Sequence, residues 1–484
     1  MRSPFVRPAL AAVLAASAVA APGLAAQTVA SAPAPRPVDW TAMQDETTRV
    51  LADYLRINTT NPPGNEIATA RYLQAFLAKE GIEARILDTT ELGAGRANLY
   101  ARLAHNSGDG SKKAVALVHH MDVVPADPRY WSMDPFSGAV KDGYLWGRGA
   151  LDMKGEGIAH LMALVALKRS GAPLTRDIVF IANADEELGS TGALVFTDRH
   201  PDLLKDVEYL FTEGGENPLG SDGKVEYYGV GVAEKRTFWQ KLTVKGTPSH
   251  GSKPTKQNPV PKLVAALDRI AKWETPLHVT PGNQKYFHDV SALPQYTAQQ
   301  RRWLSDVRTS LSTPAARAWI TSDPYRNAVL RNTISLTGLT GSNKTNVIPA
   351  EATAELDIRL LPDADPAQFL AELQRVAADT AVHFSPLLAP KAPLESPIET
   401  DMFRAIERAT RDRDPKALVT TPMLTGATDR PSYRRLGIVT YGFAPFRVTR
   451  AEDQRGVHGN DERVQVSELG WGVHYLYDVL RYVQ

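Results

Sequence analysis

Three short segments decide the fold of this chain: LVHHMD at residues 117–122, IVFIANADEE at 178–187 and VEYLFTEGG at 207–215. Each segment begins with an apolar run typical of a buried strand, and each run leads into histidine or acidic residues. In open α/β sheets, ligand sites collect beyond the carboxyl ends of the strands. The stretch from Leu117 to Glu213 therefore predicts an α/β sheet with its chemistry at one edge.

Acidic side chains are concentrated at these strand ends. Asp185 to Glu187 are consecutive acids, and Asp122, Asp152 and Glu213 are expected beside them. Clustered carboxylates repel one another, so a bound divalent cation would remove a large electrostatic penalty. Because the chain has no cysteine, imidazole and carboxylate would be the ligands, which suits zinc and also cobalt or manganese. The residues alone thus predict a metal site.

Length and composition place the chain among large globular proteins. Its 484 residues are too many for one hydrophobic core, so we expect two or more domains. The balance of 55 Lys and Arg against 54 Asp and Glu gives no reason to expect nucleic acid or an anionic membrane as a partner. The lack of cysteine excludes disulfides and thiolate chemistry.

The N-terminus has the pattern of a secretory signal. Arg2 and Arg7 precede a small-apolar run from Ala9 to Ala21. We expect residues 1–25 to be a cleaved signal peptide and residues 26–38 to be a flexible lead-in, which makes the mature protein secreted or periplasmic and free of the membrane. A membrane anchor is the alternative, but the apolar run is shorter than the roughly 20 residues that a span requires.

The order of predicted elements indicates one domain inserted into another. Strands and helices alternate over 39–235, which predicts the first part of a catalytic α/β/α sandwich. Over 236–388 the order becomes strand, helix, strand, strand, helix, strand, the pattern of a ferredoxin-like α+β domain. The α/β pattern resumes over 389–484, so the middle segment is expected to be an inserted lid domain. Within it, residues 275–330 form an excursion long enough to have a function or a structure of its own.

The candidate site residues also have structural interpretations. His120 would bind a metal, and Asp122 on the same face would fix an imidazole, although such pairs are common in surface loops. Asp152 follows a glycine-rich segment and is the candidate carboxylate that bridges two metals, although it could instead cap a helix. Glu186 and Glu187 point different ways, so one could ligate a metal while the other takes a proton; a solvated acidic turn is the alternative.

Other candidates come from more distant segments. Glu213 is a ligand candidate with a solvated acidic turn as the alternative, which the two glycines directly after it make weaker. His458 lies in a glycine-flanked loop and would reach the metals only if the chain returns to the first sheet. His250 lies in the insert, where a plain turn histidine is the alternative. Asn346 and Arg359 could hold a substrate carboxylate, or Arg359 could form an exposed salt bridge instead.

From about residue 40 to the C-terminus, the motifs as a set resemble the zinc-dependent aminoacylase and carboxypeptidase family, which includes glutamate carboxypeptidase, acetylornithine deacetylase, succinyl-diaminopimelate desuccinylase and carboxypeptidase S. The shared elements are His120-Met121-Asp122-Val123-Val124-Pro125, the segment from Gly147 to Gly155, Asp185-Glu186-Glu187, Glu213-Gly214-Gly215, His250, Asn346-Val347-Ile348-Pro349, Asp357-Ile358-Arg359, Gly426-Ala427-Thr428-Asp429 and His458-Gly459. The length and the excursion at 275–330 are most similar to the carboxypeptidase S branch.

The resemblance implies a site with two zinc ions. One zinc would be held by His120 and Glu213, the other by Glu187 and His458, and both by the bridging Asp152. Glu186 would be the general base and acid, and Asp122 would orient a metal-binding histidine. His250 would stabilise the oxyanion, often in the site of a neighbouring subunit. Asn346 and Arg359 would hold the free carboxylate of the substrate.

The substrate and the assembly are left open by these inferences. A small peptide, cleaved by a carboxypeptidase or dipeptidase, and an N-acyl amino acid, cleaved by an aminoacylase, both present an amide beside a carboxylate. A non-catalytic periplasmic binding protein is the distant alternative, and it predicts a missing ligand or base. The resemblance implies a homodimer through the lid/dimerisation domain, although the excursion at 275–330 could fill that surface and leave a monomer.

Overall fold

The computed structural model describes residues 35–388, 395–449 and 457–484. The expected signal peptide and most of the lead-in lie outside the described residues. Residues 35–484 form one compact unit. Within the described ranges, no helix is both long and apolar enough to cross a membrane.

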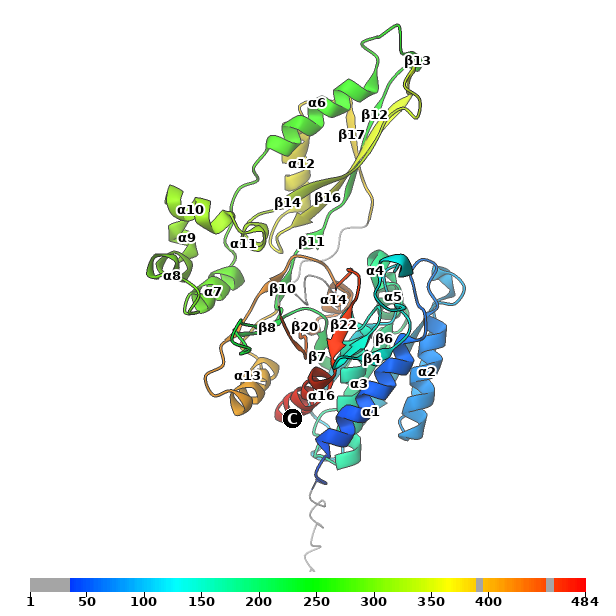
Figure 1. Cartoon of the computed structure of the whole chain (residues 1–484), viewed down its shortest axis with the longest axis vertical. Helices are drawn as coiled ribbons and strands as arrows, with labels where there is room; N and C mark the ends of the chain where they lie inside the picture. Colours follow the sequence, from blue (N-terminus) through cyan, green and yellow to red (C-terminus); the bar gives the residue numbers. More distant parts are fainter. Residues whose placement is uncertain (1–34, 389–394, 450–456) are drawn as a thin grey trace, which may run out of the picture. The chain divides into compact units, whose positions relative to one another are not determined.

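Strands from the first and last parts of the chain form a six-stranded sheet (Figure 1). In spatial order its strands are β1 (Ala84–Asp88), β2 (Ala97–Leu103), β6 (Ile178–Asn183), β3 (Ala114–His120), β7 (Val207–Thr212) and β20 (Val439–Gly442). The four strands from β6 to β20 are parallel, β2 pairs antiparallel with β6, and β1 pairs antiparallel with β2. The three apolar runs predicted as strands are therefore β3, β6 and β7, and they are direct neighbours.

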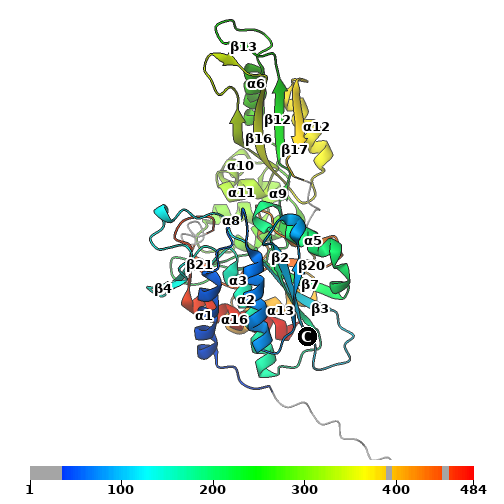
Figure 2. The ribbon, with the colours of Figure 1, turned by 90° about the vertical axis from the view of Figure 1, so that its right-hand side faces the viewer.

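Helices cover both faces of this sheet, which confirms the α/β sandwich. Leu117 and Phe180 face a core shared with α1 (Trp40–Leu55), α2 (Glu66–Lys79), α3 (Lys154–Ser170) and α16 (Val466–Tyr482). Val118 and Ile181 face the opposite core, with α5 (Thr191–Arg199) and α14 (Arg430–Arg434). Figure 2 shows the strands between α1 and α3 on one side and α5 on the other. Strands buried on both faces need apolar residues at nearly every position, which explains the apolar runs; the exception within them, Glu208 of β7, is only half-buried.

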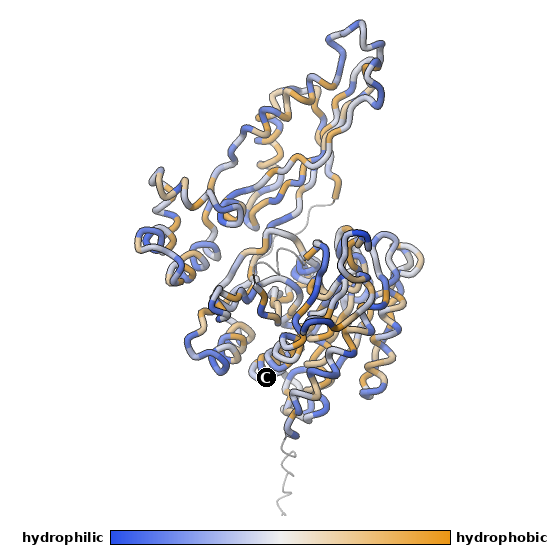
Figure 3. Tube along the Cα trace, in the orientation of Figure 1, coloured by the Kyte–Doolittle hydropathy of each residue, from blue (hydrophilic) through white to orange (hydrophobic). Residues whose placement is uncertain are grey.

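The second sheet lies within the range predicted for the insert. Its strands are β11 (Arg236–Thr237), β12 (Gln240–Lys245), β14 (Thr333–Thr340), β16 (Glu351–Leu360) and β17 (Val382–Pro386), and its helices are α6 (Pro259–Lys272) and α12 (Pro366–Ala377). The antiparallel order β14-β16-β12-β17 is that of a ferredoxin-like sheet. Along α6 the tube in Figure 3 alternates between apolar and polar colours, because every third or fourth residue packs on the sheet.

The excursion at 275–330 has a helical structure of its own. It consists of α7 (Pro281–Val290), α8 (Ala298–Ser305), α9 (Val307–Ser310), α10 (Pro314–Thr321) and α11 (Pro324–Val329). Phe287, Leu304 and Ile320 from these helices belong to the same apolar core as the catalytic sheet. The Tyr325 hydroxyl donates to the backbone oxygen of Met423 at 3.1 Å. The excursion thus packs on the second part of the α/β sandwich.

Candidate metal centre

The sheet topology brings the predicted metal ligands to one edge. His120 is the last residue of β3, Glu213 directly follows β7, and Glu187 lies in the short helix α4 (Glu186–Gly189) after β6. Because these three strands are parallel neighbours, their carboxyl ends meet at the same edge. Asp152 lies two residues before the buried start of α3, in contact with His120 at this edge.

His458 reaches the same place through a separate strand pairing. The loop that contains it leads into β22 (Arg463–Gln465), which pairs antiparallel with β5 (Tyr144–Trp146). Arg463 stands opposite Trp146, so the chain before β22 runs beside the glycine-rich segment that follows β5. The chain thus returns to the first sheet through β20, as the resumed α/β pattern predicted, and the His458 loop then lies beside the glycine-rich segment.

Five side chains form two clusters that share Asp152. In one, His120 Nε2 lies 3.1 Å from Asp152 Oδ1 and 3.8 Å from Glu213 Oε2. In the other, His458 Nε2 lies 3.1 Å from Asp152 Oδ2 and 3.2 Å from Glu187 Oε2. Within each cluster the candidate ligand atoms all lie within 4.8 Å of one another. Each oxygen of Asp152 thus faces a different histidine, which is the geometry of a bridging carboxylate.

The donor set fits two divalent cations. Glu187 Oε1 is buried and has no hydrogen-bond partner among the described residues, as expected of an atom intended for an ion. His120 Nδ1 lies 3.0 Å from the backbone oxygen of Asp122, to which it donates, so Nε2 is the nitrogen left to bind an ion between His120, Asp152 and Glu213. The peptide between Asp152 and Met153 is cis.

The charges of these groups also indicate a cation site. Hydrogen bonds to Asp152 and Glu187 raise the pKa of His458 to about 10. Burial opposes the charging of His120, but its bonds to Asp122, Asp152 and Glu213 still raise its pKa well above the usual value. Burial raises the pKa of Glu213 to about 7. The carboxylates thus favour positive charge beside them, which divalent ions would supply instead of protons.

Asp122 lies behind His120 and connects it to α4. Its buried carboxylate accepts hydrogen bonds from the backbone N–H groups of Glu186 and Glu187, each at 3.1 Å, and from Asn61 Nδ2 at 2.7 Å. The neighbouring acid Asp185 lies outside both clusters and accepts from Asn61 at 2.9 Å. Asp122 therefore fixes the position of the two glutamates as well as the imidazole.

Glu186 is adjacent to the candidate ligand Glu187 but belongs to neither cluster. It is the first residue of α4 and is half-buried. Its Oε1 accepts a hydrogen bond from the Ser190 hydroxyl at 3.1 Å. A carboxylate in this position can exchange a proton with a group at the metal edge while Glu187 faces His458.

Sequence reasoning missed the part that Glu462 plays in this site. Its carboxylate is fully buried and accepts from Arg148 Nη1 at 2.6 Å. It also accepts from the backbone N–H groups of Gly149, Leu151 and Asp152 at 2.9, 2.7 and 3.0 Å. Because Glu462 follows His458 by four residues, it joins the loops of two candidate ligands. Its place in the motif beside His458 was the available signal.

Within the described residues, no contact brings the three candidate residues of the insert to the edge of the sheet where the candidate metal ligands lie. His250 is exposed on β13 (Ser249–His250), which pairs with β15 (Val347–Ile348) beside the exposed Asn346. Arg359 lies near the far end of β16, where its Nε contacts Asp357 Oδ1 at 2.7 Å. The salt bridge that was the alternative interpretation of Arg359 is therefore present.

A mixed α/β sheet with two imidazole–carboxylate clusters sharing one aspartate defines the class of two-metal hydrolases. A family model described as Peptidase family M20/M25/M40 matches residues 116–482. The chain belongs to this family, and it is a hydrolytic enzyme.

Relatives and solved structures agree with this assignment. A probable carboxypeptidase S-like 2 of Dictyostelium discoideum is 27% identical, over 77% of this chain and 72% of its own length. An N-fatty-acyl-amino acid synthase/hydrolase of Homo sapiens is 28% identical, over 77% of this chain and 74% of its own length. The fold is similar to that of an M20 family metallo-carboxypeptidase from Sulfolobus solfataricus, with a TM-score of 0.67, 20% identity and coverage of 91% and 99% of the two chains.

Proposed function

We propose that the protein is an exported di-zinc hydrolase that cleaves an amide bond beside a free carboxylate, as a carboxypeptidase or dipeptidase. The two clusters that share Asp152, with Glu186 next to them, carry this proposal. Cobalt or manganese would suit the same ligands. The N-terminal signal pattern supports export, and the mass of the mature protein tests cleavage after about residue 25.

The chain's own residues supply the acid–base and orienting groups. The bound ions would polarise the scissile carbonyl and make water more acidic. Glu186 takes a proton from the attacking water at its carboxylate and returns it to the leaving amine. Asp122 holds Glu186 and His120 in fixed positions relative to each other through the hydrogen bonds described above. His250 Nδ1 accepts from the Ser252 N–H at 3.2 Å, so Nε2 carries the proton that would stabilise an oxyanion.

The positions of Asn346 and Arg359 favour a site shared by two chains. Asn346 precedes β16, and Arg359 is near its end. The strand between Glu351 and Arg359 alone spans about 26 Å at the usual rise per residue. One chain therefore does not place both side chains on the same substrate carboxylate. A partner that supplied Asn346 and His250 would complete the site.

We therefore propose a homodimer through β14. This edge strand exposes Leu336 and Leu339, at 49% and 58%, whereas the helical excursion packs elsewhere. We expect the double variant Leu336→Asp, Leu339→Asp to be monomeric by light scattering and to lose most of its turnover, because charges would replace the apolar contact. Leu194→Asp, on an exposed leucine of α5, is the matched control. A fully active monomeric wild type would rule the dimer out.

A second candidate substrate is an N-acyl amino acid. The similarity to the human N-fatty-acyl-amino acid synthase/hydrolase favours it. We expect the metal-loaded protein to hydrolyse dipeptides with a kcat/KM at least about tenfold above that for N-acyl amino acids with the same C-terminal residue. Parallel assays on both panels measure this ratio. The inverse ratio would select the aminoacylase, and no turnover on either panel would contradict the proposed reaction.

A further inference from the structure

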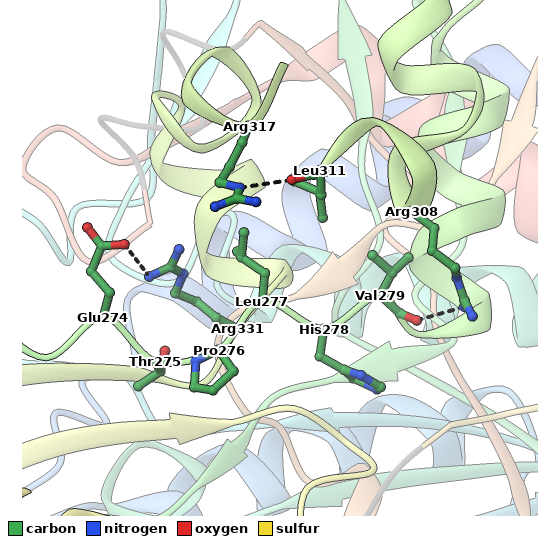
Figure 4. Close-up of a pocket in the computed structure, with 10 residues that line it drawn as sticks. All are labelled: Glu274, Thr275, Pro276, Leu277, His278, Val279, Arg308, Leu311, Arg317 and Arg331. Carbon is green, nitrogen blue, oxygen red and sulfur yellow. Dashed lines mark hydrogen bonds and ion pairs between the residues drawn. The ribbon is translucent and has the colours of Figure 1, made fainter. Parts of the chain in front are cut away.

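A cationic cavity of about 570 Å³ lies between the start of the helical excursion and its return to the second sheet (Figure 4). Its lining residues are Glu274, Thr275, Pro276, Leu277, His278, Val279, Arg308, Leu311, Arg317 and Arg331. None of these residues belongs to the candidate metal centre. The volume is in the range of sites that bind small organic molecules.

Three arginines face this cavity with one acid among its lining residues. Glu274 lies at the rim with its side chain 88% exposed, and its nearest contact with Arg331 is 3.7 Å. Arg331 is only 12% exposed, and its buried Nε has no hydrogen-bond partner among the described residues. The guanidinium group of Arg331 is therefore largely withdrawn from water, with only a long contact to an exposed carboxylate, and a bound anion would stabilise it.

The other two arginines are held in place by backbone oxygens. Arg317 Nε donates to Leu311 O at 2.8 Å, and Arg308 Nη2 donates to Val279 O at 3.0 Å. Figure 4 shows Arg317 and Arg331 extending into the same side of the pocket, next to Leu277. The N–H groups of Arg308 and Arg317 that take no part in these hydrogen bonds are therefore held in position to bind a ligand.

The backbone beneath Arg331 is also fixed. Lys235 Nζ donates to the backbone oxygen of Arg331 at 2.9 Å, and the N–H of His278 donates to Leu330 O at 2.8 Å. The segment that carries the least exposed guanidinium is thus anchored to two other parts of the chain. This rigidity favours binding, because the segment loses little conformational entropy when a ligand associates.

We propose that this cavity is a second, non-catalytic binding site for a small carboxylate that carries an apolar group. The guanidinium groups of Arg317 and Arg331 bind the carboxylate, a planar anion that matches their paired N–H donors. Leu277, Val279 and Leu311 provide the apolar wall against which the rest of the ligand packs. The proposal does not depend on the reaction at the metal centre.

Calorimetric titration of the full-length, metal-loaded protein with octanoate tests this site. We expect saturable binding, at least about tenfold weaker in Arg331→Gln and Arg317→Gln because each removes a charge-assisted bond to the carboxylate. Arg302→Gln, an exposed arginine of α8 outside the cavity, should bind as the wild type does. Arg331→Lys keeps the charge and should lie between the wild type and Arg331→Gln.

Two smaller probes separate the parts of the proposed ligand. Acetate carries the charge without the apolar group, and inorganic sulfate is an anion of another kind. We expect both to bind at least about tenfold more weakly than octanoate, since neither reaches the apolar wall. Octanoate binding that is absent, or equal in all variants, would overturn the site. Sulfate binding as tight as octanoate binding would overturn the ligand class.

Discussion

Glu186→Gln is expected to lower the turnover of an amide substrate about a thousandfold, with the fold and the metal content unchanged. Glutamine has the shape of glutamate, so it can still accept the hydrogen bond from the Ser190 hydroxyl. It cannot take a proton from water or return one to the leaving amine. Because Glu186 belongs to neither cluster that shares Asp152, the substitution removes the proton carrier without removing a ligand.

The measurement pairs kcat with elemental analysis of the same preparation. Glu83→Gln, on an exposed glutamate far along the chain from the site, is the matched control and should keep full turnover. If Glu186→Gln retained both its metal and its turnover, another group would have to carry the proton. Loss of turnover together with loss of metal would instead make Glu186 a ligand, and the roles of Glu186 and Glu187 would have to be exchanged.

The sequence was sufficient for those parts of the fold that depend on local pattern. The runs that became β3, β6 and β7 are apolar at nearly every position because both faces of these strands are buried, with the half-buried Glu208 of β7 as the exception. The order of strands and helices over 236–388 was likewise visible in the alternation of polar and apolar residues. The candidate ligands could be grouped because each follows a strand, and parallel strands end at a common edge.

Contacts between distant segments could not be predicted in this way. Glu462 bonds to Asp152 across 310 positions, and Asn61 to Asp122 across 61. The face on which α7 to α11 pack depends on shape in three dimensions. The Arg359–Asp357 pair is a different case, because residues two apart on a strand share a face, so the sequence already contained that signal.

Glu462→Ala should weaken metal binding about 10- to 100-fold and destabilise the fold by about 3–5 kcal/mol. The larger stability loss follows from burial, since Arg148 would keep a buried charge without its partner. The loss of metal affinity has a separate origin. The N–H groups of Leu151 and Asp152 would lose their acceptor, which frees the bridging carboxylate from the loop of His458.

A double variant separates these two effects. Replacing the ion pair by apolar residues, Arg148→Met with Glu462→Leu, removes the unpaired charge and should recover part of the lost stability. It leaves the N–H groups of Leu151 and Asp152 without an acceptor, so metal affinity should stay low. Urea unfolding of the metal-free proteins and competition with a chelator measure the two quantities independently. Metal affinity that recovered together with stability would show that Glu462 acts only through the fold, whereas affinity that stays low in a stable protein would establish it as the group that positions Asp152.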